Sequence, residues 1–280
     1  MPTKANERLK KIMSDLYDSS RTLIQGVLNV TPDSFSDGGK YVDLAVAVQR
    51  AKQMVAEGAD WIDIGGESTR PGSLPVDEAE ELRRVLPVLE AVRKEVDVPI
   101  TIDTYKSEVA RQALALGADI INDVWAMKRD PRMLDIAVHS GQPIILGHNR
   151  TQEMPIGLDV EQVVCDDLVK IVEYGLANGL KKEQIILDPG IGFGFKDTND
   201  NLRMMAHLDQ LVAYGYPVLL GTSRKKFIRE TLQRDADHVL EGTAATVSIG
   251  IWQGCRIVRV HDISEVFRTV QMIDAIRLNA

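Results

Sequence analysis

The feature that most constrains the fold is a repeated alternation of short apolar segments with longer segments of helical periodicity. Four helix-like segments end at a glycine and lead within a few residues into an apolar run, at Gly58, Gly117, Gly179 and Gly254. Glycine is favoured after a helix C-terminus because it accepts the left-handed conformation. The repeat predicts a chain built from β/α units.

Eight β/α units can be counted among the 280 residues, and no linker rich in Pro, Gly or Ser separates them. The expected strands are residues 23–30, 61–66, 99–104, 120–124, 143–148, 185–189, 217–222 and 257–261. Helical periodicity is clearest at residues 42–57, 77–96, 106–116, 160–178 and 263–278. This pattern predicts an α/β fold, a (β/α)8 TIM barrel of a single domain at residues 21–280, after a charged, helical or mobile N-terminal extension at residues 1–20. The competing doubly wound sheet lacks its G-x-G-x-x-G signature here.

Charge and cysteine content exclude some classes of function. A net charge of -8 and a pI near 5.2 argue against general nucleic-acid binding, because any anion site would need locally gathered Arg, Lys or His. Cys165 and Cys255 are far apart without metal-ligand spacing, which predicts a reduced, cytoplasmic protein. No apolar run is long enough to cross a bilayer, and residues 1–20 lack the apolar centre of a signal peptide, so no membrane partner is expected.

Polar side chains stand at the end of every expected strand, where barrel enzymes assemble their sites. They are Asn29; Asp63 and Glu67; Asp103; Asn122 and Asp123; His148; Asp188; Ser223, Arg224 and Lys225; and Arg259, His261 and Asp262. Any one of them could simply cap the following helix. Together they favour a binding site, because carboxylates inside apolar runs need partners, and a ligand rich in N–H groups would supply them.

Two segments that follow the first two strands are rich in turn formers, residues 31–41 and 68–76. We expect them to act as lids over the site. The first carries carboxylates and hydroxyls, hard oxygens that suit Mg²⁺ or phosphate-bound water. Phe35 stands alone among these polar residues, either as a lid contact for a flat ligand or as a residue that pins the loop to the barrel rim.

Seven motifs carry a family resemblance. In this order, LNVTPDSFSDGG, IDIGGESTRPG, TIDTYK, INDV, ILDPGIGFGF, GTSRKKF and RVHD resemble the bacterial dihydropteroate synthase family from about residue 23 to the C-terminus. The resemblance implies a transferase of folate biosynthesis in which the amine of p-aminobenzoate displaces pyrophosphate from 6-hydroxymethyl-7,8-dihydropterin pyrophosphate. It also implies Mg²⁺ as cofactor and makes the protein a sulfonamide target, since sulfonamides mimic p-aminobenzoate and should compete with that substrate.

The pterin ring presents adjacent N–H donors, and an ionised carboxylate can accept two hydrogen bonds along such an edge, which favours Asp188. Asn122 would donate and accept beside it. By resemblance, Asp103 holds another ring edge, while Lys225 reaches the ring acceptors and borders the p-aminobenzoate pocket. The structural alternatives are a turn role for Asp188 before Pro189 and a solvated position for Lys225.

Departing pyrophosphate needs fixed cations where its charge develops. Arg70, Arg259 and His261 would supply them, and with Lys225 they form the expected catalytic set; Asn29 with Mg²⁺ adds a metal contact. A loop salt bridge for Arg70 and a buried structural role for His261 are the alternatives. By resemblance, the p-aminobenzoate pocket is lined by Phe35, Thr69, Pro71, Phe193 and Ser223.

One departure from the family pattern keeps other functions in view. Many members carry Met before the histidine of the fifth strand, whereas this chain has Gly147. A non-catalytic pterin-binding paralogue is therefore one alternative. A pterin-dependent methyltransferase with a corrinoid partner is another, although it would not need the TPDSFSDGG loop or the SRK run.

Residues 242–254, GTAATVSIGIWQG, contain no charged residue, although an outer barrel helix should have a polar face. Either the N-terminal extension or a second copy of the chain must cover it. The resemblance points to a homodimer, with close backbone approach at Gly242, Ala244, Ala245 and Gly250 and an anchor at Trp252.

Overall fold

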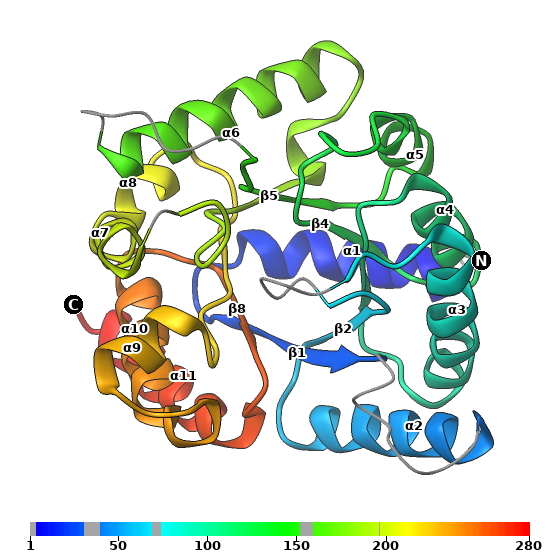
Figure 1. The fold of residues 1–280 in the computed structure, drawn as a ribbon, viewed down its shortest axis with the longest axis horizontal. Helices are drawn as coiled ribbons and strands as arrows, with labels where there is room; N and C mark the ends of the chain where they lie inside the picture. The colour runs from blue at the N-terminus through cyan, green and yellow to red at the C-terminus, as the bar shows by residue number, and fades with distance from the viewer. Residues whose placement is uncertain (1–3, 31–39, 69–73, 152–158, 196) are drawn as a thin grey trace.

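The computed structural model describes residues 4–30, 40–68, 74–151, 159–195 and 197–280, and within them the chain forms a barrel of eight parallel strands surrounded by helices (Figure 1). The strands follow the order β6-β5-β4-β3-β2-β1-β8-β7. They are β1 (Leu23–Asn29), β2 (Trp61–Gly65), β3 (Ile100–Asp103), β4 (Ile120–Asp123), β5 (Ile144–Gly147), β6 (Ile185–Asp188), β7 (Leu219–Leu220) and β8 (Ile257–Val260). The predicted TIM barrel is confirmed.

The barrel closes between β6 and β7, where the pairing is short. A single parallel bridge joins Leu187 to Val218, and the Leu187 N–H donates to the Pro217 carbonyl at 2.9 Å. The strand predicted at residues 217–222 was too long, since β7 covers only Leu219–Leu220. Proline has no N–H to give to a ladder, and beyond β7 the chain turns into the segment that holds Ser223 and Lys225.

The five segments of clearest helical periodicity are confirmed to within two residues at each end. The helices are α1 (Lys4–Tyr17), α2 (Lys40–Ala56), α3 (Glu78–Glu95), α4 (Ser107–Ala115), α5 (Arg132–Ser140), α6 (Val160–Ala177), α7 (Thr198–Ala206), α8 (Leu208–Val212), α9 (Lys226–Leu232), α10 (Leu240–Trp252) and α11 (Ile263–Arg277). Two short 3-10 turns, η2 (Lys182–Gln184) and η3 (Ala236–His238), complete the set. Most of the apolar core lies between these helices and the strands.

The four junction glycines share one geometry. Gly58, Gly117, Gly179 and Gly254 have φ between +99° and +106°. At each, the N–H of the following residue donates to a carbonyl five residues earlier, at 2.9 to 3.0 Å. This Schellman arrangement satisfies carbonyls at the helix end and turns the chain into the next strand, as the sequence predicted.

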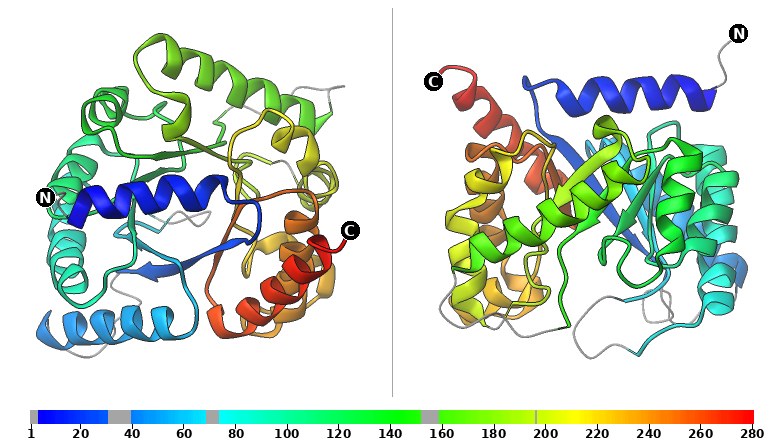
Figure 2. Two further views of the ribbon diagram at one scale, coloured as in Figure 1. Left: turned by 180° about the vertical axis from the view of Figure 1, so that it is seen from behind. Right: turned by 90° about the horizontal axis from the view of Figure 1, so that it is seen from above.

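The interior of the barrel is apolar at the end where the strands begin. Side chains from seven of the strands meet there with Ile12 and Leu16 of α1: Leu23, Trp61, Ile120, Ile145, Ile186, Leu219 and Ile257. Figure 2 shows α1 lying across this end of the barrel. The Arg256 guanidinium holds α1 in this position by donating hydrogen bonds to the backbone carbonyls of Asp15 and Leu16. The N-terminal extension therefore closes the base of the barrel.

The outer face of α10 is left uncovered by this arrangement. Ile249 and Trp252 are 50% and 56% exposed, so the alternative that the extension covers residues 242–254 was wrong. Among the described residues, no helix combines the length and apolar character needed to span a membrane.

Candidate active site

A row of polar side chains lies at the carboxyl ends of β1, β3 and β4, with a glycine of β2 among them. Strand register places Asn29 beside Gly65, Gly65 beside Asp103, and Asp103 beside Asn122. The glycine makes room for the carboxylate, because a Cβ at position 65 would lie 3.2 Å from the Cβ of Asp103. Three of the predicted substrate-binding residues are thus brought to one level of the barrel.

A buried ion pair lies beneath this row. Asp63 in β2 has no exposed surface, and its Oδ2 accepts a hydrogen bond from the Nε of Arg259 in β8 at 2.6 Å. The Nη2 of the same guanidinium lies 2.8 Å from Oδ2 of Asp103. Arg259 therefore bridges two carboxylates from two adjacent strands.

Electrostatics within this cluster are strongly coupled. Burial lowers the pKa of Arg259, but the nearby Asp63 and Asp103 outweigh it and raise that pKa overall, so the guanidinium stays charged. Burial and the neighbouring Asp63 raise the pKa of Asp103, while Arg259 opposes the rise. A ligand that donates N–H groups would stabilise the ionised form of Asp103.

Lys225 approaches the site from the segment after β7. Its ammonium donates to the Ile191 carbonyl and lies 4.4 Å from the centroid of the Phe193 ring. A Cβ at Gly221 would be within about 4 Å of both the Lys225 Nζ and the Arg259 side chain, so both side chains approach that glycine. Burial lowers the pKa of Lys225 to about 8, although Asp188 counteracts it.

Asp188 ends β6 and is 8% exposed. Its Oδ1 accepts the Gly190 N–H at 2.7 Å, which is the turn role considered as its structural alternative. Burial raises the pKa of Asp188, and Lys225 opposes the rise. A turn contact through one oxygen leaves the second oxygen as an acceptor, so Asp188 can hold the turn and still accept a hydrogen bond from a ligand.

His261 and Ser223 lie together beyond β8 and β7. The hydroxyl of Ser223 is 3.0 Å from Nδ1 of His261, and it also accepts the backbone N–H of that histidine at 3.3 Å. The Arg50 guanidinium donates to the His261 carbonyl at 3.1 Å. The predicted cation and the predicted p-aminobenzoate contact are therefore neighbours.

Gly147 is required by a close backbone approach. A Cβ at this position would lie 2.7 Å from Cα of Val124, so a larger residue would need a backbone shift between β4 and β5. Next to it, His148 is fully buried with Nε2 3.1 Å from Oδ2 of Asp167, and burial lowers its pKa. In this chain the glycine at position 147, where many family members carry Met, is explained by the close packing of β4 against β5.

Four predicted site residues, Phe35, Thr69, Arg70 and Pro71, lie outside the described residues. Asn29, the predicted metal contact, ends β1 and is partly buried at the level of Asp103. Within the described residues no group of three or more His, Cys, Asp or Glu side chains could hold a metal ion. The donor set fits Mg²⁺ as part of a substrate complex, because this ion keeps several waters and binds through few protein ligands plus phosphate oxygens.

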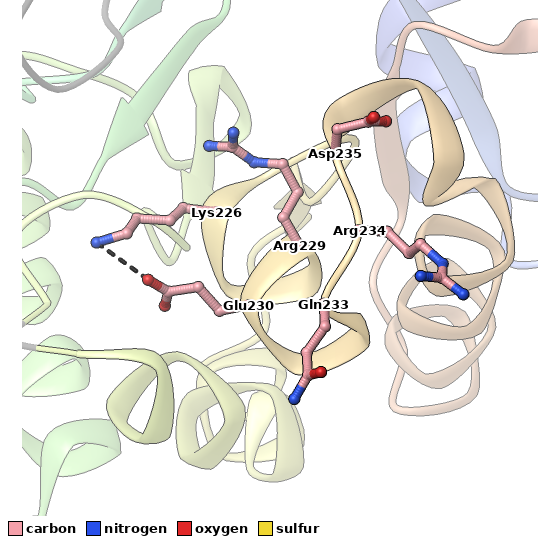
Figure 3. Close-up of a pocket in the computed structure, with 6 residues that line it drawn as sticks. All are labelled: Lys226, Arg229, Glu230, Gln233, Arg234 and Asp235. Atoms are coloured by element: carbon pink, nitrogen blue, oxygen red, sulfur yellow. Dashed lines mark ion pairs between the residues drawn. The ribbon is translucent and has the colours of Figure 1, made fainter.

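A separate surface pocket of about 420 Å³ lies on α9 and the segment after it, lined by Lys226, Arg229, Glu230, Gln233, Arg234 and Asp235. All six side chains are exposed. Figure 3 shows Lys226 paired with Glu230 while Arg229 and Arg234 point away from each other. The cations do not converge, so this pocket is not an anion site.

The predicted set omitted three residues of the buried cluster. The sequence predicts Asp63 only as a polar strand end, and it predicts no role for Thr101, which bonds to Asp63, or for Gln25, which bonds to Thr101. Thr101 donates to Asp63, and Gln25 donates to the Thr101 hydroxyl at 2.7 Å. The available signal was a carboxylate within the apolar run WIDIG, which requires a buried partner.

Comparisons with known proteins agree with this geometry. A family model described as pterin binding enzyme matches residues 25–261. The dihydropteroate synthase of Bacillus subtilis (strain 168) is 49% identical over 262 residues, which cover 94% of this chain and 91% of the relative. The chain belongs to the dihydropteroate synthase family.

Solved structures of dihydropteroate synthases have the same fold. The enzyme from Clostridium difficile, crystallised in the presence of pteroic acid, matches with a TM-score of 0.89 and 47% identity over 93% of this chain and 98% of that one. A Yersinia pestis dihydropteroate synthase with a sulfonamide drug matches with a TM-score of 0.86 and 39% identity over 93% and 96% of the two chains. The chain is therefore a transferase of folate synthesis.

Proposed function

We propose that the polar end of this barrel binds 6-hydroxymethyl-7,8-dihydropterin pyrophosphate through Asp103, Asn122, Asp188 and Lys225 and condenses it with p-aminobenzoate. The observation that carries the proposal is the meeting of these acceptors with a lysine at one end of the barrel. Carboxylates suit the N–H edge of a pterin, and the lysine suits its ring acceptors. The product would be 7,8-dihydropteroate, with pyrophosphate released.

Arg259, His261 and Arg70 are proposed to hold the pyrophosphate as its charge develops. The role of Arg259 is supported by its guanidinium, which stays charged. The role of His261 is supported by its place directly after β8, where it lies beside Ser223 from the segment after β7. Fixed cations stabilise a departing anion most where water is excluded. For Arg70 the support is its place in the STRPG motif alone.

The chemistry asks little of a protein base. The arylamine is neutral and nucleophilic at pH 7. The carbon–oxygen bond to pyrophosphate breaks, the amine nitrogen forms the new bond to the pterin methylene carbon, and that nitrogen then loses one proton. We propose that the pyrophosphate loosens first. Both cysteines are buried with raised pKa values, to about 11 for Cys165, so neither supplies a thiolate nucleophile.

The p-aminobenzoate pocket is proposed to lie beside Lys225, between Phe193 and Ser223, with Phe35, Thr69 and Pro71 completing it. The ammonium over the Phe193 ring supports this position, because it joins the aromatic wall to the pterin end of the site. The resemblance to structures that hold pteroic acid or a sulfonamide drug supports it further.

Asn29 would hold Mg²⁺ together with pyrophosphate oxygens and water. When bound, the ion would offset negative charge on the leaving group. The position of Asn29, in register with the row that carries Asp103, supports the assignment.

We propose that the protein is a homodimer that packs through α10 and α11, which lie side by side (Figure 1). Ala245, Ile249 and Trp252 are exposed at helical spacing on α10, and Met272 and Ile276 are exposed on α11. Gly242 and Gly250 do not belong to this face. Each packs inside the chain, since a Cβ there would lie 2.3 Å from Ile228 or 2.2 Å from Leu220.

A cytoplasmic location is proposed from the thiols. Cys165 and Cys255 are both free and buried, as in proteins that need no disulfides. The boundary between an extension at residues 1–20 and the barrel at 21–280 also stays a proposal. The burial of Ile12 and Leu16 makes the helix of that extension part of the folded unit.

The experiment that tests the function is a coupled assay of pyrophosphate release with the full-length chain. Release should require dihydropterin pyrophosphate, p-aminobenzoate and Mg²⁺ together. Pterin binding by calorimetry without product would instead identify a non-catalytic paralogue, and methyl transfer from a pterin to a corrinoid protein would identify the methyltransferase alternative.

A further inference from the structure

We propose that Asp63 is a positioning residue for the synthase reaction, and that its buried carboxylate sets the orientation of the Arg259 guanidinium and of the Asn122 amide. The inference rests on the roles proposed above for those two residues. Asp63 itself has no exposed surface, so it cannot meet a substrate directly and must act through its neighbours.

Asp63 is the centre of a hydrogen-bond cluster drawn from five strands. Its Oδ2 accepts from Arg259 of β8, its Oδ1 accepts from the Thr101 hydroxyl of β3, and the Asn122 Nδ2 of β4 lies 3.3 Å from both oxygens. Thr101 is held in turn by Gln25 of β1. A carboxylate with this many donors on both oxygens is fixed in rotation as well as in position.

The contact with Asn122 determines which end of the amide meets a ligand. An ionised carboxylate only accepts hydrogen bonds, so it selects the NH₂ end of the asparagine. The carbonyl oxygen of Asn122 is then left for another donor, which in the proposed binding mode is the N–H edge of the pterin. If Asp63 were replaced by an amide, either end of Asn122 could face it.

The contact with Arg259 determines the plane of the guanidinium. Asp63 and Asp103 hold Nε and Nη2 from two neighbouring strands, at 2.6 and 2.8 Å. A planar group fixed at two nitrogens cannot turn about its side-chain axis. Loss of Asp63 would leave Asp103 as the remaining carboxylate in contact, although Asp103 is itself proposed to bind substrate.

The chain offers a matched control in Asp119, which lies just before β4 at the opposite end of the barrel. Asp119 is 3% exposed and accepts hydrogen bonds from Arg8 and Arg93, both at 2.8 Å. Like Asp63, it is a buried carboxylate paired with arginine, with two guanidinium groups in place of the one on Asp63, and it lies away from the site. Asp119→Asn measures what the loss of such a charge does to the fold alone.

The test compares Asp63→Asn with Asp119→Asn in steady-state assays and thermal unfolding. Both substitutions should lower the melting temperature, because each removes a buried carboxylate charge that a guanidinium pairs with. Asp63→Asn should also lower kcat/KM for the pterin substrate about tenfold or more, with KM for p-aminobenzoate changed less than about threefold. Asp119→Asn should leave both constants near the wild-type values. The proposal would be overturned if the wild type, Asp63→Asn and Asp119→Asn all folded and had equal kinetic constants.

A double-mutant cycle with Arg259→Met separates positioning from an independent effect. In the Arg259→Met background, Asp63→Asn should cause less than about a third of the loss that it causes in the wild type. A loss of the same size in both backgrounds would show that Asp63 does not act through Arg259. A wild-type rate for Arg259→Met alone would refute the proposed function of Arg259, which is a separate result.

Thr101→Val replaces the test if Asp63→Asn fails to fold. This variant keeps the Asp63 charge and its arginine, and removes one of the donors that orient the carboxylate. The expected result is a smaller fall, about three- to tenfold, in kcat/KM for the pterin substrate. A wild-type value in this folded variant would count against a positioning role.

Discussion

Asp188→Asn is the sharpest test of pterin recognition, because the structure predicts which way the new amide will face. The Gly190 N–H lies 2.7 Å from Oδ1 of Asp188. The asparagine carbonyl can keep this bond, which forces the NH₂ group into the place of the second carboxylate oxygen. Pterin N–H donors would then meet N–H donors.

The expected loss follows from the hydrogen bonds that disappear. A bond to a charged acceptor is worth about 1.5–3 kcal/mol, and a buried donor left unpaired costs about 1–3 kcal/mol more. Allowing for partial relaxation, pterin binding should weaken by about 2–4 kcal/mol, which is an increase in Kd of about 30- to 700-fold. The loss of a charge near Lys225 acts in the same direction.

Isothermal titration calorimetry with a pterin ligand measures this loss directly. The matched control is Asp123→Asn, since Asp123 is likewise a buried carboxylate that holds a turn, by accepting the N–H groups of Trp125 and Met127 at 2.9 and 2.6 Å. The control should destabilise the protein while the folded fraction keeps its pterin affinity. Wild-type affinity in Asp188→Asn would mean that Asp188 serves the turn alone.

Four further outcomes are expected. The kcat/KM for the pterin substrate should fall as pH rises through about 8, because Lys225 then loses its proton. Lys225→Arg should remove this fall at high pH. A wild-type enzyme whose kcat/KM does not fall there would contradict the role of Lys225 as a hydrogen-bond donor. Arg259→Ala should cost about 2–4 kcal/mol of transition-state stabilisation in a folded protein, and an unchanged rate with intact pyrophosphate affinity would contradict the anion pocket. Sulfonamides should compete with p-aminobenzoate alone, and competition with the pterin substrate would argue against two pockets. Light scattering should give twice the 31.0 kDa chain mass, and Trp252→Lys should shift it toward the monomer; a monomeric wild type would refute the dimer.

The order of elements could be predicted from the sequence because its signals are local. Glycine followed by an apolar run marked four helix ends, and each of those glycines has the expected positive φ. The polar residues at the strand ends were also local signals, and strand register brings Asn29, Asp103 and Asn122 to one level. The position of α1 was not predictable in the same way, since two buried side chains on a charged helix do not say which surface they cover.

Side-chain pairing inside the barrel was decided by the tertiary structure. Arg259 and Asp63 are 196 positions apart and meet because β1 lies between their strands, with Gln25 in register with Arg259 and Val27 with Asp63. Neighbouring strands in a closed barrel are staggered. The residue that a side chain meets across the interior therefore cannot be found from the spacing of residues in the sequence. The sequence by itself determined the eight units, the helix ends and the polar rim, because these depend on the conformational preferences of adjacent residues. The buried ion pair, its carboxylate partner Asp103 and the helix that closes the base depend on the register of the whole sheet, which only the folded chain establishes.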